Sequence, residues 1–156
     1  MSEIRIRGFA DGDEAAFAAL NEEWIVRYFR LEDKDRKTLG DPVGQILSRG
    51  GEILIAESGG AAIGCCALIP MGSGSYELAK MAVTQPYQGQ GVGRLLIEAL
   101  IAAARLKNAR RLFLETNSRM APAIHLYERM GFVHLPKGAT PPSEYDRSDV
   151  CMELLL

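Results

Sequence analysis

The sequence predicts a single-domain α/β protein built on a mixed β-sheet. The chain has 156 residues, a length that suits one domain. Its apolar runs follow the order strand, helices, three strands, helix, strand, helix, strand, strand. A glycine-dense turn joins an apolar strand-like run to an apolar helix-like run near the middle of the chain. This order is typical of one α/β unit and contains no repeat or linker.

The first forty residues predict a strand followed by helical segments. Apolar and basic residues alternate over 4–7, which predicts the first strand. We expect Asp11 or Asp13 to cap a helix that reaches about Phe29. The charged segment 31–40 predicts a loop or a short helix. The helix before it has its apolar residues at helical spacing, at Phe17, Leu20, Trp24 and Tyr28.

The later elements are separated by clear turn residues. Asp41 and Pro42 predict the cap and first residue of a short helix to Leu47, and Ser58-Gly59-Gly60 predicts a tight hairpin. We expect Asn108 to end the helix that begins at Val92. The predicted strands cover 52–57, 61–70, 75–83, 111–116 and 150–154, and a further helix runs from Pro122 to Gly131, ahead of a proline-rich loop over 136–146.

Composition excludes several classes of function. The net charge of −2 argues against nonspecific nucleic-acid binding, which needs a basic face. No apolar run approaches the roughly 20 residues of a membrane span, and the N-terminus does not resemble a signal peptide. Adjacent Cys65 and Cys66 predict buried, reduced thiols on opposite faces of a strand, in a cytoplasmic protein. His125 and His134 are too isolated to predict a metal site.

The glycine-dense turn predicts an anion site. Gln88, Gly91 and Gly93 form the pattern Q-x-x-G-x-G, with a further glycine at Gly89. A helix that starts in such a turn presents unpaired N–H groups and the positive end of its dipole. A P-loop is excluded because no Lys follows the glycines, and a dinucleotide fingerprint is excluded because Arg94 stands where a third glycine is required.

With these residues the sequence resembles the GCN5-related N-acetyltransferase (GNAT) family, whose signature is [R/Q]-x-x-G-x-[G/A]. A second segment strengthens the resemblance, because A-x-x-L-Y-E-x-x-G-F from Ala123 to Phe132 is similar to the family's C-terminal cofactor-binding helix. The resemblance is clear over about 52–134. It implies a mostly antiparallel sheet of six to seven strands flanked by about four helices, and it implies acetyl-CoA as co-substrate.

The resemblance also assigns expected cofactor contacts. Backbone groups of the fourth strand are expected to pair with the pantetheine arm, and the glycine turn is expected to hold the pyrophosphate. Many members carry an asparagine that corresponds to Met120 here, so Asn117 is expected to replace it. The expected contacts are Met81, Ala82, Val83, Gln88, Gly89, Gln90, Gly91, Val92, Gly93, Arg94, Asn117, Ala123 and Tyr127. Arg94 is equally well explained as a solvated helix residue.

Two residues are the candidates for proton transfer. Tyr127 matches the family's tyrosine beside the cofactor sulfur, and it is either the acid for the departing thiolate or a packing residue. Glu77 lies six residues before Val83, at the offset of the general-base glutamate, and is either a base or a substrate anchor. Alternation in the strand is expected to place four residues on one face, Glu77, Ala79, Met81 and Val83. A backbone N–H near Val83 is expected to face the oxyanion.

The sequence does not name the acetyl acceptor. Glu22, Glu23, Glu32, Asp33 and Asp35, with Glu144 and Asp146, favour a small cationic amine, and interleaved basic residues favour a merely solvated surface. Tyr28 and Tyr145 are candidate acceptor contacts. A peptide or protein amine, and a noncatalytic acetyl-CoA sensor, remain alternatives. We expect neither nucleic acid nor membrane as a partner, and a homodimer is left open.

Overall fold

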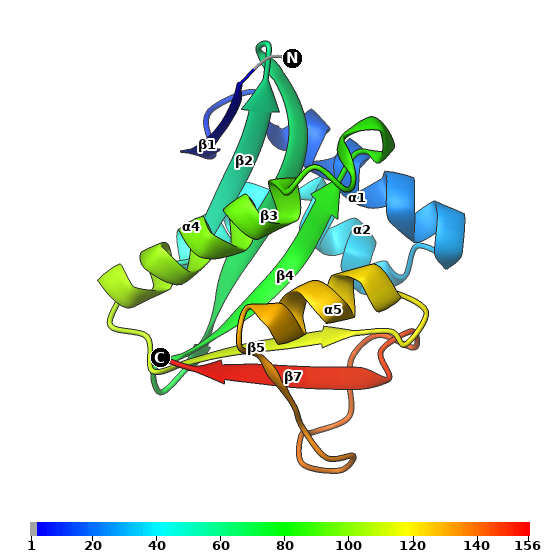
Figure 1. Cartoon of the computed structure of the whole chain (residues 1–156), viewed down its shortest axis with the longest axis vertical. Coiled ribbons are helices and arrows are strands. Elements are labelled where there is room, and N and C mark those ends of the chain that lie inside the picture. The colour runs from blue at the N-terminus through cyan, green and yellow to red at the C-terminus, as the bar shows by residue number, and fades with distance from the viewer. Residues whose placement is uncertain (1–2) are drawn as a thin grey trace.

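The computed structural model describes residues 3–156 as one seven-stranded sheet with helices on both faces (Figure 1). The strands lie in the order β1-β2-β3-β4-β5-β7-β6. They are β1 (Ile4–Gly8), β2 (Glu52–Ser58), β3 (Ala61–Gly72), β4 (Ser75–Val83), β5 (Arg111–Thr116), β6 (Val133–His134) and β7 (Val150–Leu155). Only β4 and β5 pair in parallel among these strands, which confirms a mixed, mostly antiparallel sheet.

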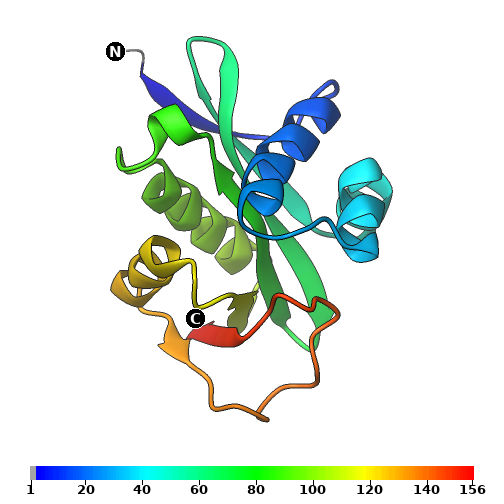
Figure 2. The ribbon, with the colours of Figure 1, turned by 90° about the vertical axis from the view of Figure 1, so that its right-hand side faces the viewer.

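Two groups of helices cover the two faces of the sheet (Figure 2). The α-helices are α1 (Glu14–Tyr28), α2 (Asp33–Gly40), α3 (Pro42–Gln45), α4 (Val92–Leu106) and α5 (Ala121–Arg129). Single 3₁₀ turns occupy Leu47–Arg49 and Gln85–Tyr87. Helices α1 and α2 lie on one side, and α4 and α5 lie on the other. The described residues thus hold five α-helices where about four were expected, because the charged segment 31–40, predicted as a loop or a short helix, forms α2.

Each face of the sheet has its own apolar core. Phe17 and Ile25 of α1 pack on Cys65 in the first core, and Leu96 and Leu100 of α4 pack in the second core, which also contains Cys66. The prediction that the two cysteines point to opposite faces is therefore confirmed. Burial raises the pKa of the Cys65 thiol to about 12 and raises that of Cys66, so both stay protonated.

The helices begin and end close to the predicted residues, but one predicted cap makes a different contact. Asp41 accepts a hydrogen bond from the Gly44 amide at 3.0 Å, as predicted for a cap. Asp13 stands at the N-cap position of α1, and its carboxylate makes no capping bond to that helix. It accepts from the Arg7 guanidinium at 2.7 Å instead. Asn108 follows α4 in a left-handed conformation with φ of 58°.

A β-bulge in β4 overturns one expectation about the site. Ala79 pairs with Ala67 and Ala82 with Cys65, so three steps along β4 oppose two along β3. Lys80 takes up the extra residue with φ of 54°. Met81 therefore turns to the α4 core, which Leu78 also joins, and Val83 does the same. The expected single face for Glu77, Met81 and Val83 is wrong, because one inserted residue reverses the alternation.

Strands β4 and β5 separate along their length. They pair only over Ser75–Glu77 and Arg111–Phe113, although β4 continues to Val83 and β5 to Thr116. Figure 1 shows the two strands diverging beyond that point. The sheet therefore opens between its two halves at the ends of these strands, which is where the predicted site residues are concentrated.

Candidate active site

A cavity of about 920 Å³ occupies the opening between β4 and β5. This volume lies at the upper end of the range of small-molecule and cofactor sites. The cavity brings together nearly all the residues predicted from the sequence. They are Tyr28, Glu77, Met81, Ala82, Val83, Gln88, Gly89, Gly91, Val92, Gly93, Arg94, Asn117, Ala123, Tyr127 and Tyr145. Gln90 is the exception, since its side chain is exposed and donates to the Pro86 carbonyl at 3.0 Å.

The glycine turn has the backbone shape expected of an anion site. Gly89 and Gly91 adopt φ of 78° and 84°, a region that side chains rarely enter. Gly91 is the N-cap of α4, so the first amides of that helix face the turn. Gln88 donates to the Val83 carbonyl at 2.9 Å and ties the turn to β4. Gln88 therefore has a structural role in this chain, whatever the turn binds.

Glycine is required at position 93 for a different reason than at positions 89 and 91. A Cβ atom there would lie 3.0 Å from the Leu126 side chain, so its absence lets α5 pack closely on α4. Arg94, at the next position, is exposed and pairs with Glu98 at 2.8 Å. This contact leaves the guanidinium at the rim of the cavity, beside the glycine turn.

Tyr127 is the buried residue of α5. Its ring is 6% exposed and packs at 5.9 Å between centroids on Phe132. Burial raises the pKa of the Tyr127 phenol, which keeps its hydroxyl protonated and able to donate. Asn117 donates to the Arg147 carbonyl at 2.7 Å and accepts from the Arg119 amide at 2.8 Å. The Asn117 side chain thus orders the chain between β5 and α5 while it lines the cavity.

Glu77 is the most perturbed carboxylate of the cavity. Burial raises its pKa to about 7, and the neighbouring Glu115 carboxylate adds to the rise. Lys34 and Lys80 partly offset the rise. Within residues 3–156 no side chain donates a hydrogen bond to Glu77 or pairs with it, whereas Glu115 accepts from the Ser143 hydroxyl at 2.8 Å. A carboxyl group that titrates near neutral pH inside a cavity is suited to general-base chemistry.

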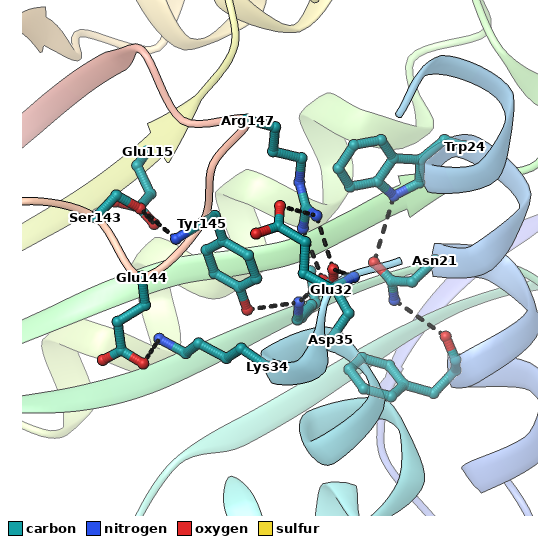
Figure 3. A network of polar contacts seen from close by, with 12 residues as sticks. Asn21, Trp24, Glu32, Lys34, Asp35, Glu115, Ser143, Glu144, Tyr145 and Arg147 are labelled. Carbon is teal, nitrogen blue, oxygen red and sulfur yellow. Dashed lines mark hydrogen bonds and ion pairs between the residues drawn. The ribbon is translucent and has the colours of Figure 1, made fainter. Parts of the chain in front are cut away.

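A buried charge network walls the cavity beside Glu77 (Figure 3). Asp35 of α2 is fully buried and accepts from Lys80 at 2.9 Å and from both terminal nitrogens of Arg147 at 2.7 Å. Although burial opposes ionisation, these hydrogen bonds hold the pKa of Asp35 well below its usual range. Tyr145 accepts a hydrogen bond from Lys80 at 3.0 Å. The network therefore joins α2, β4 and the loop after β6.

Sequence reasoning missed the cations of this network. Lys80 was not singled out, although a lysine in an otherwise apolar strand is a signal of a buried partner. The partners of Lys80, Asp35 and Tyr145, are distant in sequence, and no local pattern links them. Glu115 was missed as well. It follows the apolar residues of β5 near the end of that strand, two residues before Asn117, and that position is the signal that could have identified it.

The acids predicted to attract a cation are mostly engaged with the protein's own bases. Glu32 pairs with Arg147, Asp33 with Arg36, and Asp146 with Arg30, whereas Glu23 accepts from the Thr84 hydroxyl. Only Glu144 of that predicted set lines the cavity, and it lies 3.4 Å from Lys34.

The two predicted aromatic contacts both line the cavity. The Tyr145 ring has Arg147 at 4.5 Å, Lys80 at 4.8 Å and Lys34 at 5.1 Å from its centroid, so it already contacts three cations of this chain. Tyr28 is 37% exposed and has the Arg27 guanidinium at 5.2 Å from its ring.

Other classes of site have no counterpart in the part of the chain that the structure describes. Residues 3–156 hold no group of three or more His, Cys, Asp or Glu placed to bind a metal ion. Over the same residues, none of the helices combines the length and the apolar character of a membrane span.

Comparison with known proteins gives one consistent family. Residues 14–132 match the family described as "Acetyltransferase (GNAT) family". The rat protein "N-acetyltransferase family 8 member 2" is 30% identical over 99 residues, which are 60% of this chain and 44% of that protein. The chain thus spans less than half the length of this curated relative.

Solved structures share the fold across nearly the whole chain. A GNAT-family acetyltransferase from Staphylococcus aureus Mu50 has a TM-score of 0.89 at 18% identity, over 97% of this chain and 98% of its own. The PaiA N-acetyltransferase of Thermoplasma acidophilum, solved with coenzyme A, has a TM-score of 0.78 at 18% identity, over 99% of both chains. The matched segment covers β2 to β5, the glycine turn and α5, and the chain belongs to the GNAT family of acetyltransferases.

Proposed function

We propose that this protein is an acetyl-CoA-dependent N-acetyltransferase that transfers the acetyl group directly to a small primary amine in a ternary complex. One observation carries the proposal. A single cavity joins a glycine turn suited to a pyrophosphate with a carboxylate whose pKa is about 7. The family membership and the neighbour solved with coenzyme A support the choice of cofactor.

The residues present fit acetyl-CoA in both size and chemistry. The turn at Gly89 and Gly91 offers helix N-terminal amides to a pyrophosphate, with Arg94 at its rim. Beyond Glu77, β4 is free of β5, so its backbone can pair with an extended amide-containing arm at Met81 and Val83. Bound acetyl-CoA would supply the thioester.

The catalytic roles follow from the state of each side chain. Glu77 removes the proton that an ammonium must lose before its nitrogen can attack. The amide near Val83 donates to the oxygen where negative charge develops. The buried Tyr127 hydroxyl stays protonated and donates to the sulfur as the carbon–sulfur bond breaks. The acceptor enters as an ammonium cation, which the carboxylates Glu77 and Glu115 attract.

The test is thiol release from acetyl-CoA with a panel of amines, run on the wild type and on Tyr127→Phe. The variant keeps the ring and its packing on Phe132, so we expect acetyl-CoA to bind with unchanged Kd while kcat falls about 100-fold. Equal kcat in the variant would assign Tyr127 to packing alone. Binding of acetyl-CoA without turnover of any amine, peptide amines included, would instead identify a sensor.

A further inference from the structure

The acceptor side of the cavity keeps charges of both signs after the protein's own ion pairs are removed. Lys80 and Arg147 are neutralised by Asp35, and Arg147 also contacts Glu32 at 3.3 Å. Lys34 faces Glu144 at 3.4 Å. These contacts give the cations of this wall, Lys34, Lys80 and Arg147, acidic partners, whereas Glu115 has only the Ser143 hydroxyl (Figure 3).

Several charged side chains of the cavity form no ion pair within residues 3–156. Among them are the carboxylates Glu77 and Glu115 and the bases Lys37 and Arg49. Lys37 lies one helical turn after Lys34, whose charge acts on Glu77. Lys37 and Arg49 are both exposed, so each can bind a ligand without breaking an ion pair within the protein.

The location of the two cations separates them from the cofactor turn. Arg49 ends the 3₁₀ turn before β2, and the following Gly51 packs against the Leu68 carbonyl of β3. The next residue, Ile69, pairs with Glu77 and lines the same cavity. The two cations therefore lie on the α2 side of the sheet and line the same cavity as Glu77, whereas the glycine turn begins α4 on the other side.

From this arrangement we propose that the acceptor is an amino acid or a similar small molecule that carries a carboxylate as well as the reacting amine. Its ammonium lies toward Glu77 and Glu115, and its carboxylate lies toward Lys37 and Arg49. Such a ligand complements both sets of charges, whereas a diamine would place a second cation against two unpaired bases. This inference rests on the proposed function and names the substrate class for the same cavity.

Matched acceptor pairs test the proposal. Glycine, 4-aminobutyrate and 6-aminohexanoate are each compared with the n-alkylamine of the same chain length, and phenylalanine with phenylalaninamide and phenethylamine. In at least one series we expect the carboxylate member to have a kcat/KM about tenfold higher, which is about 1.4 kcal/mol. Cadaverine is expected to be a worse acceptor than 6-aminohexanoate. Equal or better turnover of the partners that lack a carboxylate in every series would overturn the proposal.

Variants of the two bases assign the effect. Lys37→Met and Arg49→Met should each raise KM for the preferred carboxylate acceptor about fivefold to tenfold and reduce the preference for it over its matched amine. Arg36→Met is the control, because Arg36 lies on α2, is exposed, pairs with Asp33 and does not line the cavity. A preference that survives both variants contradicts the assignment. If no amine of any kind is acetylated, the proposed function itself fails and the inference falls with it.

Discussion

At the scale of single residues, Glu77 combines an environment that is unfavourable for charge with a proposed role that requires the charged form. Its folded-state pKa of about 7 lies above the usual value of 4.5. As pH rises from 4.5 to 7 the unfolded chain loses its proton first, so stability falls over this window and is constant above it. The proposed base role requires the ionised form, so we expect activity to rise as Glu77 ionises around pH 7, at the upper end of the window in which stability falls.

Replacing Glu77 by Gln should therefore change stability and activity in opposite directions. Gln keeps the shape and removes the charge, so the stability of Glu77→Gln relative to wild type should increase between pH 5 and pH 8. The largest slope is about 1.4 kcal/mol per pH unit. Urea unfolding of both proteins at pH 5 and at pH 8 measures this difference in stability. In the same variant kcat/KM should fall and lose its acidic limb near pH 7, and an unchanged pH–rate profile would show that Glu77 is not the base.

At the scale of elements, the glycines of the turn divide into two functions that their spacing alone did not separate. Gly89 and Gly91 supply positive φ, and Gly93 supplies room for Leu126. The Q-x-x-G-x-G pattern predicted where the turn is, because strand, turn and helix are local. It did not predict the helix contact, because Leu126 belongs to α5, 33 residues further along the chain.

Gly91→Ala should test the anion site with little effect on packing. A Cβ atom at this position would have no atom within 4 Å, so the only cost of the change is strain in the backbone, which has φ of 84°. We expect at least about tenfold weaker acetyl-CoA binding by calorimetry. Gly60→Ala is a matched control, with φ of 82° and open space around it in the hairpin between β2 and β3. If both variants lose similar stability and only Gly91→Ala loses affinity for acetyl-CoA, the result supports the turn as the cofactor site.

The second feature at this scale is the β-bulge at Lys80 and the charge network around Asp35. Lys80 reaches Asp35 across 45 residues of sequence, and Arg147 reaches it across 112. Neither contact leaves a local pattern, and the extra residue at Lys80 interrupts an alternation that the sequence shows as regular. Sequence reasoning therefore located β4 correctly and assigned the faces of its second half wrongly.

Asp35→Asn should destabilise the fold more than Lys80→Met. The first change leaves two cations without their shared anion at a site that is 0% exposed, whereas the second leaves Asp35 with Arg147. Loss of one partner of a buried pair costs about 3–5 kcal/mol, and the retained Arg147 contact should reduce the cost of Lys80→Met. Chemical denaturation measures both. Asp33→Asn, on the exposed face of α2, should have little effect. A reversed order would contradict the shared-anion description.

At the scale of the whole molecule, the sheet is two paired halves joined by a short parallel contact. The three-residue pairing of β4 with β5 is the only strand pairing in residues 3–156 that connects β1–β4 to β5–β7. Periodicity predicted nearly all the strands and helices, since burial on one or both faces is recorded in local sequence. The opening between the halves was implied only by family resemblance, because no residue pattern records where two strands stop pairing.

Acetyl-CoA should therefore stabilise the molecule across this opening. A ligand that binds only the folded state at 100 times its Kd adds about 2.7 kcal/mol, which for a chain of this size raises Tm by roughly 5–10 °C. Hydrogen exchange should slow in 79–83 and 88–93, which border the cavity, and stay unchanged in β1 and in the hairpin between β2 and β3. Gly91→Ala should lose most of the Tm shift. Protection spread evenly over both halves, or confined to the α1 side, would contradict binding between β4 and β5.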